Sequence, residues 1–303
     1  MDEIVTIVIP TYKRPDRVRR AVLSAISQTY QPLEIIVVDD NGNNTDDALK
    51  TFEALEDLVE NKIISYFCND VNRGGSYSRN IGLSNSHGDY ITFLDDDDEI
   101  ESTKIERQVD RLNILGNAYG AVYTGYKKIL ESGKIHHSNE KVEGDVFKYA
   151  LSRSIYVGSG SNLLVRKKIA MRINGYDVDF KRNQDLEFMT RVLKNTKLAY
   201  VDDELLTIHY EIREIKRSYQ ELIEIDEFYV NKFKEDILSL GPKDSQDVFS
   251  IIALERFKYS LFKNVVDGTR NLYRTKVKFI VIIKYTIYLI DRIINSKSYG
   301  FKL

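Results

Sequence analysis

The sequence lacks several features that would narrow its function at once. Cys68 is the single cysteine among 303 residues, so the chain can form no internal disulfide, and we expect a cytoplasmic location. The formal net charge of −2 argues against a dedicated nucleic-acid binder, so we expect no nucleic-acid partner. We find no secretory signal core, internal repeat or low-complexity linker. What remains is the composition of a globular chain, with 43% apolar and 30% charged residues.

Charge is distributed unevenly along the chain. From Arg256 to the C-terminus there are eleven Lys or Arg residues against Asp267 and Asp291, a net charge of about +9. The rest of the chain therefore carries about −11. An acidic body can host a cation, whereas a basic tail suits phosphate groups or an anionic membrane surface.

Apolar periodicity predicts alternating strands and helices in the first hundred residues. Strands are expected over 4–9, 34–38, 63–67 and 90–94, and helices over 16–28, 47–59 and near 76–84. This alternation is typical of an α/β fold with a mostly parallel central sheet flanked by helices. Further on, the pattern predicts strands over 121–130 and 162–166 and a helix over 185–194. Beyond about residue 215 the chain is predicted to be mostly helical, with a break at 240–242.

Polar clusters follow three of the expected strands. They are Thr11-Tyr12, Asp39-Asp40 and the run Asp95–Asp98. Ligands of parallel α/β sheets bind outside the carboxyl ends of the strands. We therefore expect these three clusters to meet in one crevice.

The run Asp95–Asp98 is the most informative of the three clusters. Four adjacent carboxylates repel one another unless positive charge lies among them. A strand followed by Asp-x-Asp can hold Mg²⁺ or Mn²⁺, since these ions prefer oxygen ligands and often keep substrate phosphates as partners. The alternative is a solvated acidic turn or a helix N-cap.

The other clusters suit a nucleotide. Tyr12 could stack on a base, and Asp40 could accept a hydrogen bond from a uracil or thymine imide N–H. Gly74 allows the backbone to approach a ligand closely, and Arg79 can pair with phosphate or carboxylate. The alternatives are a tyrosine at the rim of the core, an Asx turn, and a tight turn before a helix with a surface arginine.

Taken together, these motifs resemble the inverting glycosyltransferases of family 2. The resemblance is carried by Ile7–Arg14, Ser27–Tyr30, Glu34–Asp40, Asn72–Gly74 with Ser78–Asn80, and Gly88–Asp97. It continues more loosely through Ser161–Arg166, Asn174–Asp177 and Gln184–Phe188. Gln184 departs from the acidic residue that the family has at this position, whereas Asp185 matches.

The resemblance implies a GT-A fold with a Rossmann-like nucleotide-binding half. Residues 1–215 would form the glycosyltransferase domain, with a nucleotide-binding half over 1–100 and an acceptor half over 101–215. Residues 216–303 would be a helical, basic extension. The expected reaction moves a hexose or N-acetylhexosamine from a UDP-sugar, or a dTDP-sugar, to a saccharide or lipid-linked saccharide. Bacterial surface polysaccharide, capsule or glycolipid synthesis is the implied setting.

The resemblance also implies roles for individual residues. Asp185 would be the general base, Asp97 would hold Mn²⁺ or Mg²⁺, and Asp95 would assist through water. The implied nucleotide-binding residues are Pro10, Thr11, Tyr12, Arg14, Asp40, Gly74, Arg79 and Asp96. For Asp185, the alternative is an aspartate favoured at a helix N-terminus. His209 is predicted either to touch the diphosphate or to lie at the surface.

Residues 277–294 are the most apolar stretch of the chain. Lys278, Lys284, Asp291 and Arg292 make a transmembrane span improbable. The segment predicts an amphipathic helix that lies on the inner face of an anionic membrane, with lysines among the headgroups. The alternative is a helix that packs on the body of the protein or on a partner subunit in a homo-oligomer.

Two other functions fit parts of the sequence. A nucleotidyltransferase also uses an α/β sheet and a carboxylate-held metal, but Thr11–Pro15 lacks the glycine of a triphosphate loop. A non-catalytic sugar-nucleotide-binding scaffold is the second alternative. The acid run and Asp185 argue against it.

Overall fold

The computed structural model describes residues 3–210 and 218–303. The chain divides into two compact units, the first formed by Met1–Asp145 with Val157–Tyr210 and the second by Val146–Tyr156 with Glu211–Leu303. The domain boundary expected after residue 215 lies outside the described residues.

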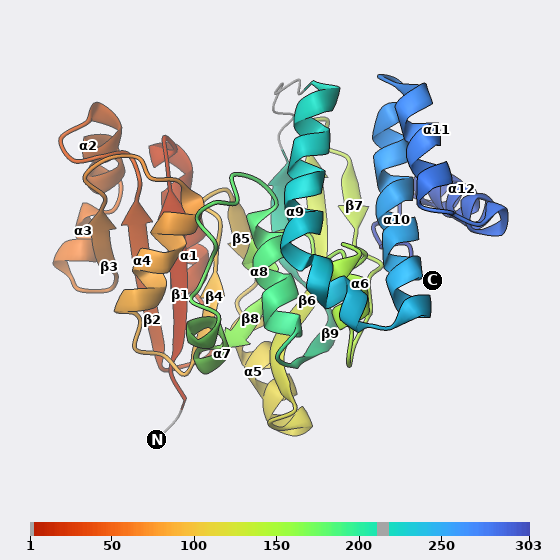
Figure 1. Cartoon of the computed structure of the whole chain (residues 1–303). Coiled ribbons are helices and arrows are strands. Elements are labelled where there is room, and N and C mark those ends of the chain that lie inside the picture. The colour runs from red at the N-terminus through yellow and green to blue at the C-terminus, as the bar shows by residue number, and fades with distance from the viewer. Residues whose placement is uncertain (1–2, 211–217) are drawn as a thin grey trace. The chain divides into compact units, whose positions relative to one another are not determined.

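A nine-stranded sheet organises the first unit (Figure 1). Its strand order is β3-β2-β1-β4-β8-β6-β9-β5, with β7 paired to β6. The strands are β1 (Val5–Thr11), β2 (Leu33–Asp39), β3 (Ser65–Cys68), β4 (Tyr90–Phe93), β5 (Asp98–Ile100), β6 (Tyr119–Leu130), β7 (Ile135–His137), β8 (Leu164–Arg166) and β9 (Lys197–Tyr210). The first four strands are parallel to one another, and β8 joins them to the mixed second half by an antiparallel pairing with β4.

Helices connect these strands, some of them predicted from the sequence and others, such as those over 104–115 and 167–172, not predicted. They are α1 (Pro15–Ile26), α2 (Asp46–Glu53), α3 (Glu56–Glu60), α4 (Gly75–Asn85), α5 (Lys104–Leu115), the 3₁₀ turn η1 (Gly160–Asn162), α7 (Lys167–Arg172) and α8 (Gln184–Leu193). The α/β class is confirmed. The single helix expected over 47–59 is wrong, since the chain turns at Ala54-Leu55, where the Leu55 side chain is fully buried.

Burial explains why β1 can occupy the centre of the sheet. Val5, Ile7, Val8 and Ile9 are each fully buried, because the helices α1 and α4 pack against β1 and β2 and β4 pair with its two edges. A strand buried on both faces has a continuous rather than an alternating apolar sequence. The strand ends at Thr11, directly before the exposed Tyr12 and Lys13.

A buried ion pair fixes the turn between α7 and α8. Glu187 is fully buried and pairs with Arg191 one helical turn later. Arg191 also donates to the carbonyl oxygens of Ile173 at 2.6 Å and Gly175 at 2.7 Å. One side chain thus ties α8 to the turn that precedes Tyr176.

Replacing Glu187 with alanine is expected to destabilise the first unit by about 3–5 kcal/mol, because it leaves the Arg191 charge without its carboxylate. The free energy of unfolding in urea would measure the loss. Glu53→Ala, at an exposed position of α2, is the control and should stay within about 0.5 kcal/mol of wild type. Equal stability of the two variants would show that the ion pair does not hold the turn.

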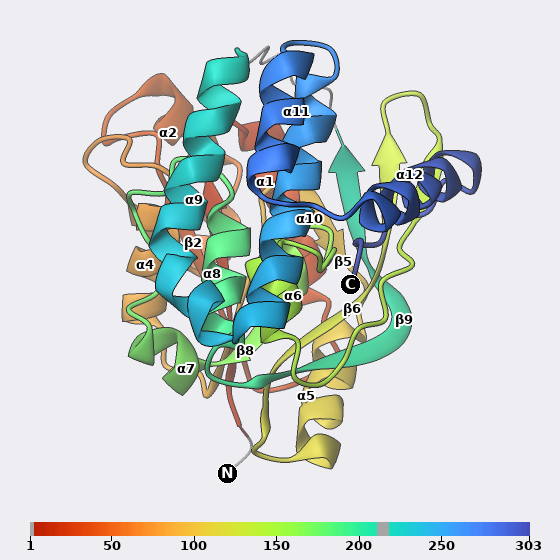
Figure 2. The same ribbon diagram turned by 45° about the vertical axis from the view of Figure 1, so that its right-hand side comes forward.

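The second unit is helical, as predicted. It contains α6 (Phe147–Leu151), α9 (Tyr219–Ser239), α10 (Pro242–Ser260), α11 (Val265–Arg274) and α12 (Phe279–Ile294). The break between α9 and α10 falls at Gly241, whose φ of +86° favours glycine. Figure 2 shows α10 and α11 side by side, with α12 turned away from their direction. Among the described residues, no helix is both long and apolar enough to cross a membrane.

Candidate active site

The ends of β1 and β2 lie next to each other. Thr11 is in register with Asp39, and the Asp40 N–H donates to the Thr11 carbonyl oxygen at 2.9 Å. Strand β4 pairs with the other side of β1, so the run Asp95–Asp98 leaves the sheet at the same edge. The three polar clusters predicted to meet are therefore close together.

Asp96 links the β1 loop to the acid run. Its Oδ2 accepts hydrogen bonds from the Thr11 hydroxyl at 2.8 Å and from the Tyr12 N–H at 3.4 Å. Its Oδ1 lies 2.5 Å from Arg14, which also lies 2.8 Å from Asp97. Arg14 thus supplies positive charge between two carboxylates of the run. Pro10, within β1, precedes this contact and makes none of these polar contacts.

The acid run has the chemistry of a cation site that a ligand completes. Burial and the charges of Asp95 and Asp96 raise the pKa of Asp97 to about 6, against the opposing effect of Arg14. A cation would relieve this excess of negative charge. In residues 3–210 and 218–303, no three His, Cys, Asp or Glu side chains are grouped to hold a metal ion. The carboxylates of Asp95 and Asp97 are oxygen donors of the kind that Mn²⁺ or Mg²⁺ takes, and Mg²⁺ commonly has one or two carboxylates together with substrate phosphates as ligands.

Asp40 is buried and organises the loop before α4. Its carboxylate accepts hydrogen bonds from the Asn69 amide at 2.7 Å, the Arg73 N–H at 2.9 Å and the Gly74 N–H at 2.7 Å. A carboxylate has about four acceptor sites, so the contacts with the loop leave capacity for one more donor. Tyr12, in contrast, is 42% exposed, and its ring has surface available for stacking.

Arg79 connects the acid run to the start of α8. Its guanidinium lies 2.6 Å from Asp95 and donates to the Gln184 side-chain oxygen at 3.2 Å. It also stacks over the Tyr176 ring at 5.2 Å. Gln184 therefore accepts a charge-assisted hydrogen bond from Arg79 but, being uncharged, forms no ion pair with it.

Asp185 follows Gln184 in the first turn of α8 and is half-buried. The backbone of Gly160 lies against its carboxylate and favours the charged form. Burial raises the pKa of Asp185 above its usual range, the charge of Asp95 adds to this rise, and Arg79 opposes it. A carboxylate with a raised pKa is a stronger base, which suits proton abstraction near neutral pH.

The sequence did not reveal how Asp98 contributes. Its buried Oδ2 accepts hydrogen bonds from the hydroxyls of Ser159 at 2.7 Å and Ser161 at 2.6 Å. These two serines flank Gly160, and the Ser161 hydroxyl also accepts the Asp95 N–H at 3.0 Å. The sequence feature that could have indicated this turn is the run of small residues over 158–162, which is unusual before a buried strand.

His209 lies on β9 and contacts a carboxylate. Its Nε2 is 2.6 Å from Glu99 Oε1, and Glu99 also lies 3.2 Å from Arg20. Arg20 in turn donates to the Asp97 carbonyl oxygen at 3.0 Å. In this structure, His209 is thus joined to the acid run through Glu99 and Arg20.

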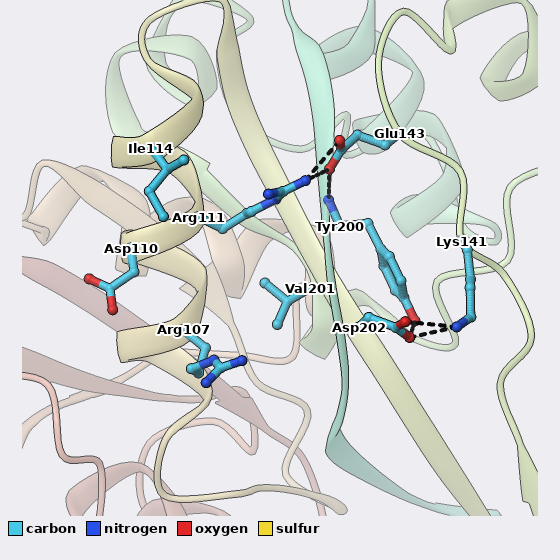
Figure 3. A pocket seen from close by; sticks show the side chains of 9 residues that line it. All are labelled: Arg107, Asp110, Arg111, Ile114, Lys141, Glu143, Tyr200, Val201 and Asp202. Carbon is cyan, nitrogen blue, oxygen red and sulfur yellow. Dashed lines mark hydrogen bonds and ion pairs between the residues drawn. The ribbon is translucent and has the colours of Figure 1, made fainter.

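A separate hollow of about 600 Å³ lies between α5 and β9 (Figure 3). It is lined by Arg107, Asp110, Arg111, Ile114, Lys141, Glu143, Tyr200, Val201 and Asp202. Each basic side chain there already pairs with an acid: Arg107 with Asp203, Arg111 with Glu143, and Lys141 with Asp202. Because these charges are matched within the protein, we assign this hollow no ligand.

Comparison with known sequences identifies glycosyltransferases as relatives of this chain. The family model for glycosyl transferase family 2 matches residues 6–173, more than half of the chain. The uncharacterized glycosyltransferase RT0329 of Rickettsia typhi is 28% identical over 233 residues, which is 74% of this chain and 69% of that protein. WfaP of Escherichia coli, a UDP-Glc:alpha-D-GlcNAc-diphosphoundecaprenol beta-1,3-glucosyltransferase, is 38% identical over 107 residues, 35% of this chain and 40% of that protein.

Solved structures agree on the fold. The crystal structure of residues 1–349 of S. aureus TarS matches with a TM-score of 0.66 at 15% identity, over 89% of this chain and 78% of that one. The same protein has been solved with UDP-GlcNAc, and that complex matches with a TM-score of 0.64. The fold is thus the GT-A fold, and this chain is a glycosyltransferase that belongs to glycosyl transferase family 2.

Proposed function

We propose that this glycosyltransferase moves a hexose or N-acetylhexosamine from a UDP-sugar, or a dTDP-sugar, to an acceptor hydroxyl with inversion of the anomeric carbon. One observation carries the proposal: Arg79 contacts Asp95 at 2.6 Å and Gln184, the neighbour of Asp185, at 3.2 Å. The acid run that would face the donor diphosphate and the carboxylate that would activate the acceptor are therefore within reach of one substrate.

The donor would bind at the carboxyl ends of β1, β2 and β4. The exposed Tyr12 ring would stack on the base, and Asp40 would use its remaining acceptor capacity for the imide N–H. Asp96 would lie near the ribose, and Arg14 and Arg79 would offer positive charge to the phosphates. This assigns nucleotide binding to residues 1–100 and acceptor binding to 101–215.

Asp97, assisted by Asp95, would hold Mn²⁺ or Mg²⁺ beside the diphosphate. When bound, such an ion stabilises negative charge that develops on the leaving group. Asp185 would accept the proton of the acceptor hydroxyl as its oxygen attacks the anomeric carbon. The bond from that carbon to the diphosphate oxygen breaks in the same step, so the nucleoside diphosphate leaves from the opposite face.

The acceptor class is proposed from the relatives. WfaP acts on a sugar linked through diphosphate to undecaprenol, and the solved TarS complex holds UDP-GlcNAc. We therefore favour a UDP donor and a saccharide or lipid-linked saccharide acceptor, in bacterial surface polysaccharide or glycolipid synthesis. An enzyme that acts on such an acceptor would be located in the cytoplasm, at the inner face of the membrane.

Titration of UDP, dTDP, GDP and CDP by calorimetry, with and without Mn²⁺, tests the donor site. We expect Mn²⁺-dependent binding of UDP or dTDP to wild type, and its loss in Asp97→Ala, because that variant removes the carboxylate that would face the ion. Asp110→Ala, an exposed acid on α5, is the matched control and should bind like wild type.

Two outcomes would contradict the proposal. If Asp97→Ala keeps metal-dependent binding, the cation lies elsewhere. If no nucleotide binds, the donor site is not formed by these residues. Release of pyrophosphate rather than nucleoside diphosphate on turnover would favour the nucleotidyltransferase alternative. Nucleotide binding without turnover of any donor would favour a scaffold.

A further inference from the structure

The helix α12 exposes a continuous apolar surface, which we call the α12 stripe. Its residues are between 39% and 79% exposed and recur every three or four positions along one face of the helix: Phe279, Ile280, Ile283, Ile287, Ile290, Ile293 and Ile294. Scattered apolar side chains are common on protein surfaces, but a row of this length usually marks a surface that contacts something else.

The opposite face of α12 is fixed to the second unit. Tyr285 and Tyr288 are buried, and their rings pack 5.1 Å and 5.3 Å from the Phe301 ring. The Tyr285 hydroxyl donates to Glu255 at 2.7 Å, and the Tyr288 hydroxyl donates to the Tyr299 carbonyl oxygen at 2.8 Å. These contacts fix the rotation of the helix, so within this unit the stripe faces away from the core.

The charges around the stripe are basic. Lys276 and Lys278 precede the helix, Lys284 lies within it, and all three are exposed. The two acids of residues 256–303 are held in local contacts. Asp267 accepts from Tyr219 at 2.6 Å, and Asp291 accepts from Tyr299 at 2.5 Å.

We propose that the α12 stripe docks on an anionic lipid bilayer surface, with the isoleucines among the acyl chains and the lysines among the headgroups. An amphipathic helix that combines an apolar face with basic flanks lies in the plane of the membrane interface, and its binding depends on anionic lipid.

The dimensions of the stripe argue against a second copy of this chain as its occupant. The 16 residues of α12 extend about 24 Å, and a stripe roughly 10 Å wide offers only about 240 Å². A stable protein interface needs about 800 Å² on each partner. Two copies facing each other would also bring their lysines together, which is unfavourable.

Sedimentation of the full-length protein with vesicles tests this proposal without any activity measurement. Wild type should bind vesicles of phosphatidylcholine with about 30% phosphatidylglycerol and should bind phosphatidylcholine alone far more weakly. Ile287→Glu should weaken binding by roughly tenfold or more, since it places a charge in the middle of the stripe. Ile114→Glu makes the same change at an exposed isoleucine of α5 and should bind like wild type.

A second variant separates the charge contribution from the apolar one. Replacing Lys276, Lys278 and Lys284 with glutamine should weaken binding to the anionic vesicles by about 100-fold at low salt. Circular dichroism would show that each variant is folded.

The proposal fails if wild type does not bind anionic vesicles or if Ile287→Glu binds as wild type does. It also fails if wild type is a dimer that Ile287→Glu converts to a monomer, since a second copy would then cover the stripe. None of these outcomes bears on the donor site, which nucleotide titration tests independently.

Discussion

Replacing Asp185 with asparagine is expected to lower kcat by about 10²- to 10⁴-fold, because the amide cannot accept the proton of the acceptor hydroxyl. Asparagine has nearly the same shape, so it fits the space beside Gly160 that the carboxylate occupies. The contacts among Thr11, Tyr12 and Asp96, which we propose to bind the nucleotide, are not altered. Steady-state kinetics with a UDP-sugar, together with calorimetry of UDP, would separate the chemical step from donor binding.

The matched control for this substitution is Asp179→Asn. Asp179 is exposed and lies in the segment that leads to α8, so the same chemical change there should leave kcat within about twofold of wild type. If Asp185→Asn retains wild-type turnover, Asp185 is not the base, and its place at the helix N-terminus is structural. If Asp185→Asn loses UDP binding as well, the residue acts on the donor rather than on the acceptor.

The meeting of the polar clusters that we propose as the donor side could be predicted from the sequence, because it depends only on where strands end. Each cluster directly follows an apolar strand, and parallel strands bring their carboxyl ends to the same edge. Thr11, Asp40 and Asp96 therefore lie together once the strand order is known. The contact between Thr11 and Asp96 spans 85 residues, yet it depends only on the pairing of β1 with β4.

The acceptor side could not be predicted in the same way. The position of Asp185 depends on Gly160, and the position of Gly160 depends on Asp98, which is about sixty residues away in sequence. No periodic pattern relates these segments, since 158–162 is a short run of small residues without a helical or strand period. The resemblance implied roles for Asp95, Asp96 and Asp97 but none for Asp98, so the structural use of Asp98 was not predicted.

Asp98 places the two sides of the site relative to each other. One oxygen of its carboxylate, Oδ2, accepts hydrogen bonds from the hydroxyls of both Ser159 and Ser161, which lie on either side of Gly160. The Ser161 hydroxyl accepts a hydrogen bond from the Asp95 N–H, and Gly160 lies against the Asp185 carboxylate. The turn η1 is thus held between the acid run and α8. A displacement of this turn would change the distance between Asp185 and the acid run, which we propose to face the diphosphate.

Gly160→Ala is expected to lower kcat by about 100-fold, because a shift of about 1 Å in a reacting group has an effect of this size. A Cβ on Gly160 would lie 2.8 Å from Asp185 Oδ1 and 3.0 Å from its Cγ, so the carboxylate must move. The φ angle of Gly160 is not in the left-handed region, so alanine fits the backbone and the fold should be kept. Kinetics of this variant, with UDP calorimetry as a check on the donor side, would measure the effect.

A double-mutant cycle distinguishes displacement of the base from general damage to the site. If Gly160→Ala acts through Asp185, then adding it to Asp185→Asn should cost little further activity, since the base is already lost. If the two losses multiply instead, the methyl group disturbs something other than Asp185. Ser159→Ala offers a milder test, because it removes one hydrogen bond to Asp98 and leaves the space around Gly160 open. A fall in kcat with unchanged UDP binding in that variant would show that the turn is held in place by Asp98, and unchanged kcat would show that Ser161 suffices.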